Sequence, residues 1–147
     1  MKTAFFTFCL LVCSYSAFCH TKKEDFDYSI VFGGCFEKDV VSLKINNTSI
    51  FSNYKVENRS AIKRGNLSLT QAKKGIHLFY NGHEKYQGKV DFDFYLNIDV
   101  TVNNKVNKFK IDLRKGKVML VENCSAENGV GTRKITIEQM QEQVIFM

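Results

Sequence analysis

Proline and tryptophan are both absent from this 147-residue sequence, and its aromatic residues are all phenylalanine or tyrosine. A chain without proline cannot form collagen-like, mucin-like or PxxP segments, so these classes are excluded. Long apolar runs are also missing. No stretch reaches the roughly 20 consecutive apolar residues that a transmembrane helix needs, and the sequence therefore predicts no membrane span.

The most apolar stretch lies at the N-terminus. Lys2 precedes an apolar run over residues 4–12, and small residues follow that run. This order is typical of a secretory signal peptide, which we assign to residues 1–19. It predicts a secreted protein, extracellular in general and periplasmic if the host is a bacterium.

Cysteine usage agrees with export. Cleavage after Ser16 and cleavage after Cys19 both fit the signal, but the second leaves an even pair, Cys35 and Cys124, in a mature chain of residues 20–147. An even pair in an exported chain predicts a disulfide. Closing so long a loop would stabilise the fold by roughly 4–5 kcal/mol in the chain-entropy model.

Apolar and polar residues alternate most regularly over residues 90–102, where the even positions are apolar. Because successive side chains of a strand point to opposite faces, this pattern predicts a central strand with one buried face. Shorter alternating runs separated by turn signals predict about eight or nine strands in total and no helix.

The expected architecture is a single-domain antiparallel β-sandwich. A closed lipocalin-like β-barrel is the alternative. We rank it second because lipocalins usually carry a Gly-x-Trp motif near the first strand, and this chain has no tryptophan.

Dipeptides that accept positive φ predict the hairpins. Asn46-Asn47 pairs Ile45 with Thr48 and Leu43 with Ile50, and Asn81-Gly82 closes a second hairpin.

Two further turns extend the predicted central strand. A turn at residues 104–105 places Val100 opposite Phe109, and a turn at Lys115-Gly116 returns the chain again. Residues 90–122 are therefore expected to form a three-stranded meander.

A basic cluster lies on the predicted return strand and the turn after it, in a chain of net charge +6. Its members are Lys105, Lys108, Lys110, Arg114, Lys115 and Lys117. Such a cluster suits an anionic glycan or a membrane surface, whereas nucleic acid is not an expected partner. The alternative is a solvated sheet face with lysines at its edge, the commoner meaning of a charge run.

Asp91, Asp93 and Asp99 share one face of the predicted strand. Paired carboxylates serve glycoside hydrolysis or calcium binding, but no calcium-loop motif accompanies them, and alternating Asp also simply forms a wet face.

Histidine offers one metal hypothesis. If the mature chain starts at His20, its amino group and imidazole could chelate copper, with His77 or His83 completing the site. This resembles the histidine brace of lytic polysaccharide monooxygenases, which are secreted β-sandwiches. No other motif of that family is present, so we expect no metal and no cofactor, and keep a copper-binding or oxidative protein as the alternative.

Five Asn-x-Ser/Thr sequons would be N-glycosylation acceptors if the host is eukaryotic. They begin at Asn46, Asn47, Asn58, Asn66 and Asn123.

The run 39–47, followed by Ile50-Phe51 and residues 54–56, resembles the opening hairpin of small uncharacterised exported bacterial β-sandwich proteins. Residues 109–117 and 135–146 are similar to their closing strands. The resemblance implies export and a β-sandwich, and it brings no catalytic residue. We therefore expect a secreted, non-enzymatic binding or structural protein that contacts anionic surfaces or glycans.

Overall fold

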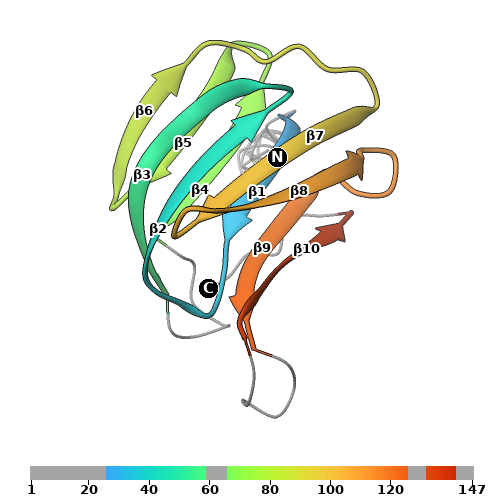
Figure 1. Ribbon diagram of the computed structural model, residues 1–147. Helices are drawn as coiled ribbons and strands as arrows, with labels where there is room; N and C mark the ends of the chain where they lie inside the picture. Colours follow the sequence, from blue (N-terminus) through green and yellow to red (C-terminus); the bar gives the residue numbers. More distant parts are fainter. Residues whose placement is uncertain (1–25, 59–65, 126–131, 142–147) are drawn as a thin grey trace, which may run out of the picture.

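The computed structural model describes residues 26–58, 66–125 and 132–141, which form two β-sheets packed face to face (Figure 1). None of these residues lies in a helix, and thus the described part of the chain contains no helix that could cross a membrane. The predicted signal peptide, residues 1–19, and the copper candidate His20 lie outside the described residues.

Ten strands make up the two sheets. The larger sheet has the order β10-β9-β1-β4-β5-β6, and the smaller has the order β3-β2-β7-β8. Their bounds are β1 Phe26–Phe32, β2 Phe36–Ile45, β3 Thr48–Asn58, β4 Leu67–Ala72, β5 Gly75–Tyr80, β6 His83–Gln87, β7 Tyr95–Val102, β8 Lys105–Asp112, β9 Val118–Cys124 and β10 Lys134–Met140. Every neighbouring pair is antiparallel except β1 and β9, which run parallel. The predicted β-sandwich is confirmed, and the sheets do not close into the alternative barrel.

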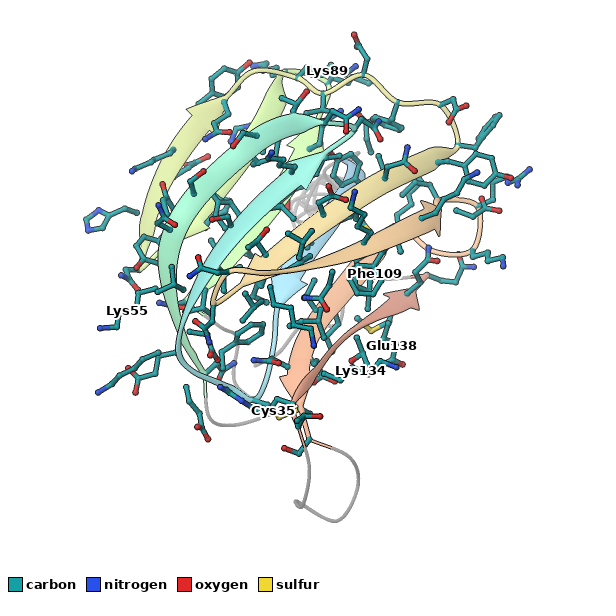
Figure 2. All side chains as sticks on the ribbon, viewed as in Figure 1. Cys35, Lys55, Lys89, Phe109, Lys134 and Glu138 are labelled. Atoms are coloured by element: carbon teal, nitrogen blue, oxygen red, sulfur yellow. A yellow bond between two sulfur atoms is a disulfide. The ribbon has the colours of Figure 1, made fainter. Side chains whose placement is uncertain are left out.

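One hydrophobic core fills the space between the sheets, and side chains from both layers point into it (Figure 2). A chain of aromatic contacts crosses this core, with ring centroids 4.5–5.9 Å apart. Its members are Phe32, Phe36, Phe51, Tyr54 and Tyr80. Burying such rings stabilises the sandwich through removal of apolar area from water and through edge-to-face packing.

Asparagine occupies three of the two-residue turns, β2–β3, β5–β6 and β7–β8. Asn46 and Asn47 have φ values of 47° and 66°, and Asn81 and Gly82 have 51° and 77°. Both predicted hairpins are confirmed, including the pairing of Ile45 with Thr48. Leu43 faces Phe51 rather than Ile50, because the register shifts beside Leu43.

The predicted register of β7 and β8 is wrong by two residues. The turn lies at Asn103-Asn104, with φ values of 48° and 69°, so Val100 faces Asn107 instead of Phe109. Two asparagines satisfy a turn that needs positive φ twice, which the pair at 104–105 does less well. A shift of two residues leaves every side chain on its predicted face.

The predicted meander over residues 90–122 is also wrong. Strand β7 begins only at Tyr95, and residues 88–94 cross from the larger sheet to the smaller one. After β8 the chain crosses back, and β9 pairs with β1, Ser29 opposite Val118. Gly116 is buried at this crossing, where a Cβ would lie 2.6 Å from the Met140 carbonyl oxygen.

Candidate functional site

An open pocket lies where the crossing segment 88–94 enters strand β7. It has a volume of about 550 Å³. Its lining residues are Asn46, Asp91, Phe92, Asp93, Tyr95, Asn97 and Lys110. They come from the β2–β3 turn, the crossing segment, β7 and β8, so the pocket exists only because β2, β7 and β8 are neighbours in the smaller sheet.

The buried side chain of Gln71 on β4 anchors the crossing segment. Its Nε2 donates to the Val90 carbonyl oxygen (3.0 Å), and its Oε1 accepts from the Val90 N–H (3.1 Å). The Tyr28 hydroxyl donates to the same Oε1 (3.1 Å). Burial, with the negative charge of Asp27, raises the pKa of Tyr28, so this hydroxyl keeps its proton.

Asn46 holds the segment on its other side. Its Nδ2 donates to the Asp91 carbonyl oxygen (2.9 Å), and its Oδ1 accepts from the Asn97 N–H (2.9 Å). The Asn46 N–H donates in turn to the Asn97 carbonyl oxygen (2.8 Å). The residue that bends the β2–β3 turn therefore also fixes one wall of the pocket.

The pocket combines several kinds of binding group. Asp91 and Asp93 supply carboxylate acceptors, Asn97 an amide that both donates and accepts, and Lys110 an ammonium donor. The Lys110 Nζ lies 4.7 Å from the centre of the Tyr95 ring. The Tyr95 N–H donates to Asp93 Oδ1 (2.8 Å). Polar groups around aromatic rings in a concave site are typical of ligand recognition.

Arg114 supports the rim of the pocket. Its Nε and Nη2 donate to Asp112 (2.8 and 2.7 Å), and Nη2 also donates to the Tyr95 hydroxyl (2.7 Å). The hydrogen bonds and positive charge of Arg114 lower the pKa of Asp112 to about 2. The guanidinium lies 5.6 Å from the ring centre of Phe94, which is 62% exposed.

The six basic residues predicted to bind anions do not gather around one point. Lys108 and Lys110 share the outer face of β8, and the Lys108 Nζ lies 4.0 Å from Asp99 Oδ2. Arg114 is engaged by Asp112. Lys105 lies at the hairpin end, and Lys115 and Lys117 lie in the β8–β9 connection. Of the six, Lys110 lines the pocket, and anion binding by the cluster stays a prediction.

The two described histidines do not converge. His77 lies opposite Tyr86 and His83 lies opposite Tyr80, so strand alternation places the two histidines on opposite faces of the larger sheet. The His77 Nδ1 makes a hydrogen bond with Glu84. Within residues 26–58, 66–125 and 132–141, no cluster of three or more His, Cys, Asp or Glu could hold a metal.

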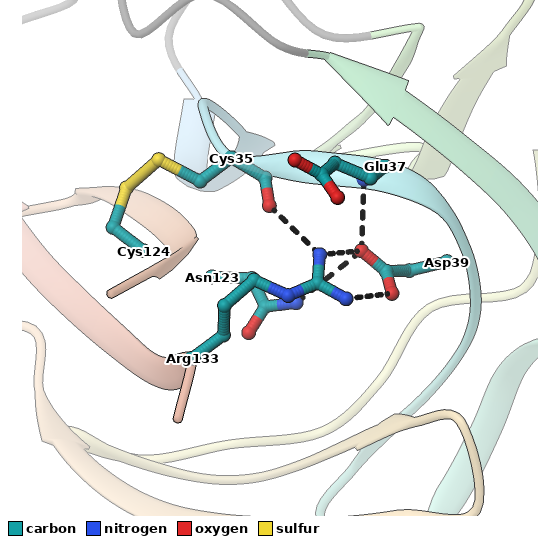
Figure 3. Close-up of a disulfide and its surroundings, with 6 residues drawn as sticks. All are labelled: Cys35, Glu37, Asp39, Asn123, Cys124 and Arg133. Carbon is teal, nitrogen blue, oxygen red and sulfur yellow. Dashed lines mark hydrogen bonds and ion pairs between the residues drawn. A yellow bond between two sulfur atoms is a disulfide. The ribbon is translucent and has the colours of Figure 1, made fainter. Parts of the chain in front are cut away.

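A second polar centre surrounds Asp39 near the start of β2, away from the pocket, which lies beyond the end of this strand. Figure 3 shows the residues of this centre. The Asp39 side chain is 2% exposed. It accepts from the Glu37 N–H (2.9 Å), Arg133 Nη1 and Nη2 (2.8 and 3.0 Å), Asn103 Nδ2 (2.6 Å) and Asn123 Nδ2 (3.3 Å). Burial raises the pKa of Asp39, but these hydrogen bonds and the Arg133 charge outweigh it and hold the pKa below its usual value.

The predicted disulfide adjoins this centre. Cys35 and Cys124 are joined across 89 residues of sequence, with their Cα atoms 5.0 Å apart (Figure 3). The Cys35 carbonyl oxygen accepts from Arg133 Nη1 (3.3 Å). Because every oxygen of Asp39 is already bound by protein donors, the centre is structural and ties the β1–β2 connection to β9 and β10.

Sequence reasoning did not find the Asp39 centre. Its partners Asn103, Asn123 and Arg133 lie 64, 84 and 94 residues away along the chain. No local pattern marks such a set, and a buried Asp within an alternating strand has the same sequence signature as an exposed one.

Comparisons of the chain with protein-family models, curated proteins and solved structures found no match. The resemblance to exported bacterial β-sandwich proteins therefore stays a prediction.

Proposed function

We propose that the protein is a secreted, non-enzymatic binding module that holds a glycan in the pocket between Asn46 and Lys110. The observation that carries this proposal is that carboxylate, amide, ammonium and aromatic groups line one pocket. Hydrogen bonds from Gln71 and Asn46 hold the crossing segment that forms one of its walls. Sugar hydroxyls both donate and accept hydrogen bonds, and the C–H faces of sugar rings pack against aromatic side chains.

The charge distribution favours hydroxyl groups over a bare anion. Asp91 and Asp93 line the pocket together with Lys110, and these carboxylates repel sulfate or phosphate. The nearby cations Lys108 and Arg114 are already paired with Asp99 and Asp112.

Secretion is supported by two separate observations. The first is the signal-like pattern of residues 1–19, and the second is the Cys35–Cys124 disulfide, since such bonds persist mainly in oxidising compartments.

An array of neutral and sulfated oligosaccharides tests the proposal, followed by calorimetry on the best-bound oligosaccharide. We expect neutral oligosaccharides to bind, and Asn97→Ala and Lys110→Ala each to weaken binding about tenfold, the equivalent of one lost hydrogen bond. Lys108→Ala is the matched control, since Lys108 lies on the same strand and face but outside the pocket. It should change the affinity less than twofold.

Two outcomes would contradict glycan binding in the pocket. Absence of binding to every oligosaccharide would reject a glycan ligand. Equal losses for Lys108→Ala and Lys110→Ala, with binding restricted to sulfated sugars and abolished by salt, would instead assign the function to the basic face as a whole.

A further inference from the structure

The fold uses the asparagines of the five sequons in different ways. Asn123 is 5% exposed and donates to Asp39, and Asn58 is 7% exposed. A glycan on either side chain would have to occupy space that the folded protein already fills.

Two more sequon asparagines are partly buried and use their amide groups. Asn46 bonds Asp91 and Asn97 through both ends of its amide. Asn66 Nδ2 donates to the Lys55 carbonyl oxygen (3.1 Å) and to Asn81 Oδ1 (2.8 Å). Attaching a sugar at Nδ2 would replace one hydrogen of an amide that holds two segments together.

Asn47 differs from the other four. It is the second residue of the β2–β3 turn, with φ at 66°, and it is exposed. Its side chain makes no hydrogen bond within the described part of the chain. Thr48 and Ser49, which complete its sequon, are exposed as well.

We propose that Asn47 is the N-glycan acceptor of this protein, with a polyprenyl-diphosphate oligosaccharide as the donor. The Asn47 Nδ2 forms a bond to C1 of the donor's first sugar, and the C1–O bond to the diphosphate breaks. The bonding pair leaves with the diphosphate, and the amide releases one proton.

The fold explains why a glycan at Asn47 is compatible with secretion of the folded protein. Glycan transfer precedes folding, so several asparagines are open to it in the unfolded chain. A glycan at Asn58 or Asn123 prevents the core from closing, whereas one at Asn47 projects from a hairpin tip and displaces no contact.

The test is secretion of the full chain from a eukaryotic cell line, with intact mass measured before and after enzymatic removal of N-glycans. We expect one glycan, and we expect peptide mapping to place the resulting Asn-to-Asp mass change at position 47. The proposal does not depend on what the pocket binds.

Three variants separate Asn47 from its neighbour without changing either asparagine. Ser49→Ala destroys the sequon of Asn47 and should remove the glycan. Ser49→Thr keeps the sequon and should keep the glycan. Thr48→Ala destroys the sequon of Asn46 but keeps that of Asn47, and it should leave the glycan in place.

Several results would overturn the assignment. These are an unmodified wild-type protein, a glycan that survives Ser49→Ala, and a glycan lost in Thr48→Ala. If a variant is not secreted, translation with microsomes and peptide mapping still report whether Ser49→Ala removes the glycan from Asn47 and Thr48→Ala leaves it there.

Discussion

Asp39 is held by several donors at once, because a buried carboxylate is tolerated only when donors surround it. Here those donors come from β2, the β7–β8 turn, β9 and Arg133. Removing one of them leaves a charge in the interior with nothing to replace the lost interaction.

Arg133→Ala should lower the free energy of unfolding by about 3 kcal/mol, the lower end of the range for breaking a buried ion pair, since Arg133 itself is partly exposed. Urea denaturation measures the loss. The exposed neighbour Lys134 offers the matched control, and Lys134→Ala should change stability by less than about 0.5 kcal/mol. Equal stabilities of the two variants would show that the Asp39 pair does not stabilise the fold.

The carboxylates of Asp39 and Asp112 should make the free energy of unfolding depend on pH. The pKa values of Asp39 and Asp112 are lower in the folded protein than their usual 3.8, so near pH 4 the unfolded chain binds more protons. The stabilisation is complete above pH 5 and is lost as the pH falls through the folded pKa values. Thermal unfolding from pH 7 to pH 2 should therefore show a falling Tm.

Asp39→Asn should flatten this fall, although it also lowers stability at pH 7. A slope unaffected by Asp39→Asn would mean that other groups carry the acid sensitivity.

At the scale of the strand, alternation predicts which face is buried but not which neighbour a strand takes. This is why the hairpins at Asn46-Asn47 and Asn81-Gly82 match expectation, whereas β9 is assigned to the wrong partner. Extended crossing segments alternate too, since Val90 is buried while Asp91 is exposed. Strand β6 shows no period-two pattern because four of its five residues are exposed, so the Asn81-Gly82 turn is what predicts it.

The β7–β8 turn should tolerate glycine better than alanine at its second position. Asn104 has φ at 69°, a conformation that costs an alanine about 1 kcal/mol and glycine almost nothing. Asn104→Ala should therefore destabilise the protein by about that amount, and Asn104→Gly should equal or exceed wild-type stability. Thermal melts of the two variants compare them directly, and an alanine variant as stable as the glycine variant would contradict the turn assignment.

At the scale of the whole molecule, the sequence predicted the two-layer architecture and the disulfide, but not the pocket. Asn46 and Lys110 are far apart in sequence, and they line one site only because β2 and β8 both flank β7. Residues that meet through sheet order leave no trace in local spacing.

The disulfide should contribute about 4 kcal/mol, because it closes a loop of 89 residues. The double variant Cys35→Ala, Cys124→Ala should lose this amount in urea denaturation, and reduction of the wild-type protein should give a matching loss. An unchanged midpoint after both treatments would show that the sheets alone determine stability.

The parallel pairing of β1 with β9 also sets an order of events during biogenesis. Strand β1 lies near the start of the described chain, yet one of its two neighbours is supplied only when Val118–Cys124 has left the ribosome. The larger sheet can therefore be completed only after β9 has been made. A nascent chain whose first strand waits for the ninth therefore stays partly open while most of the described residues are being made.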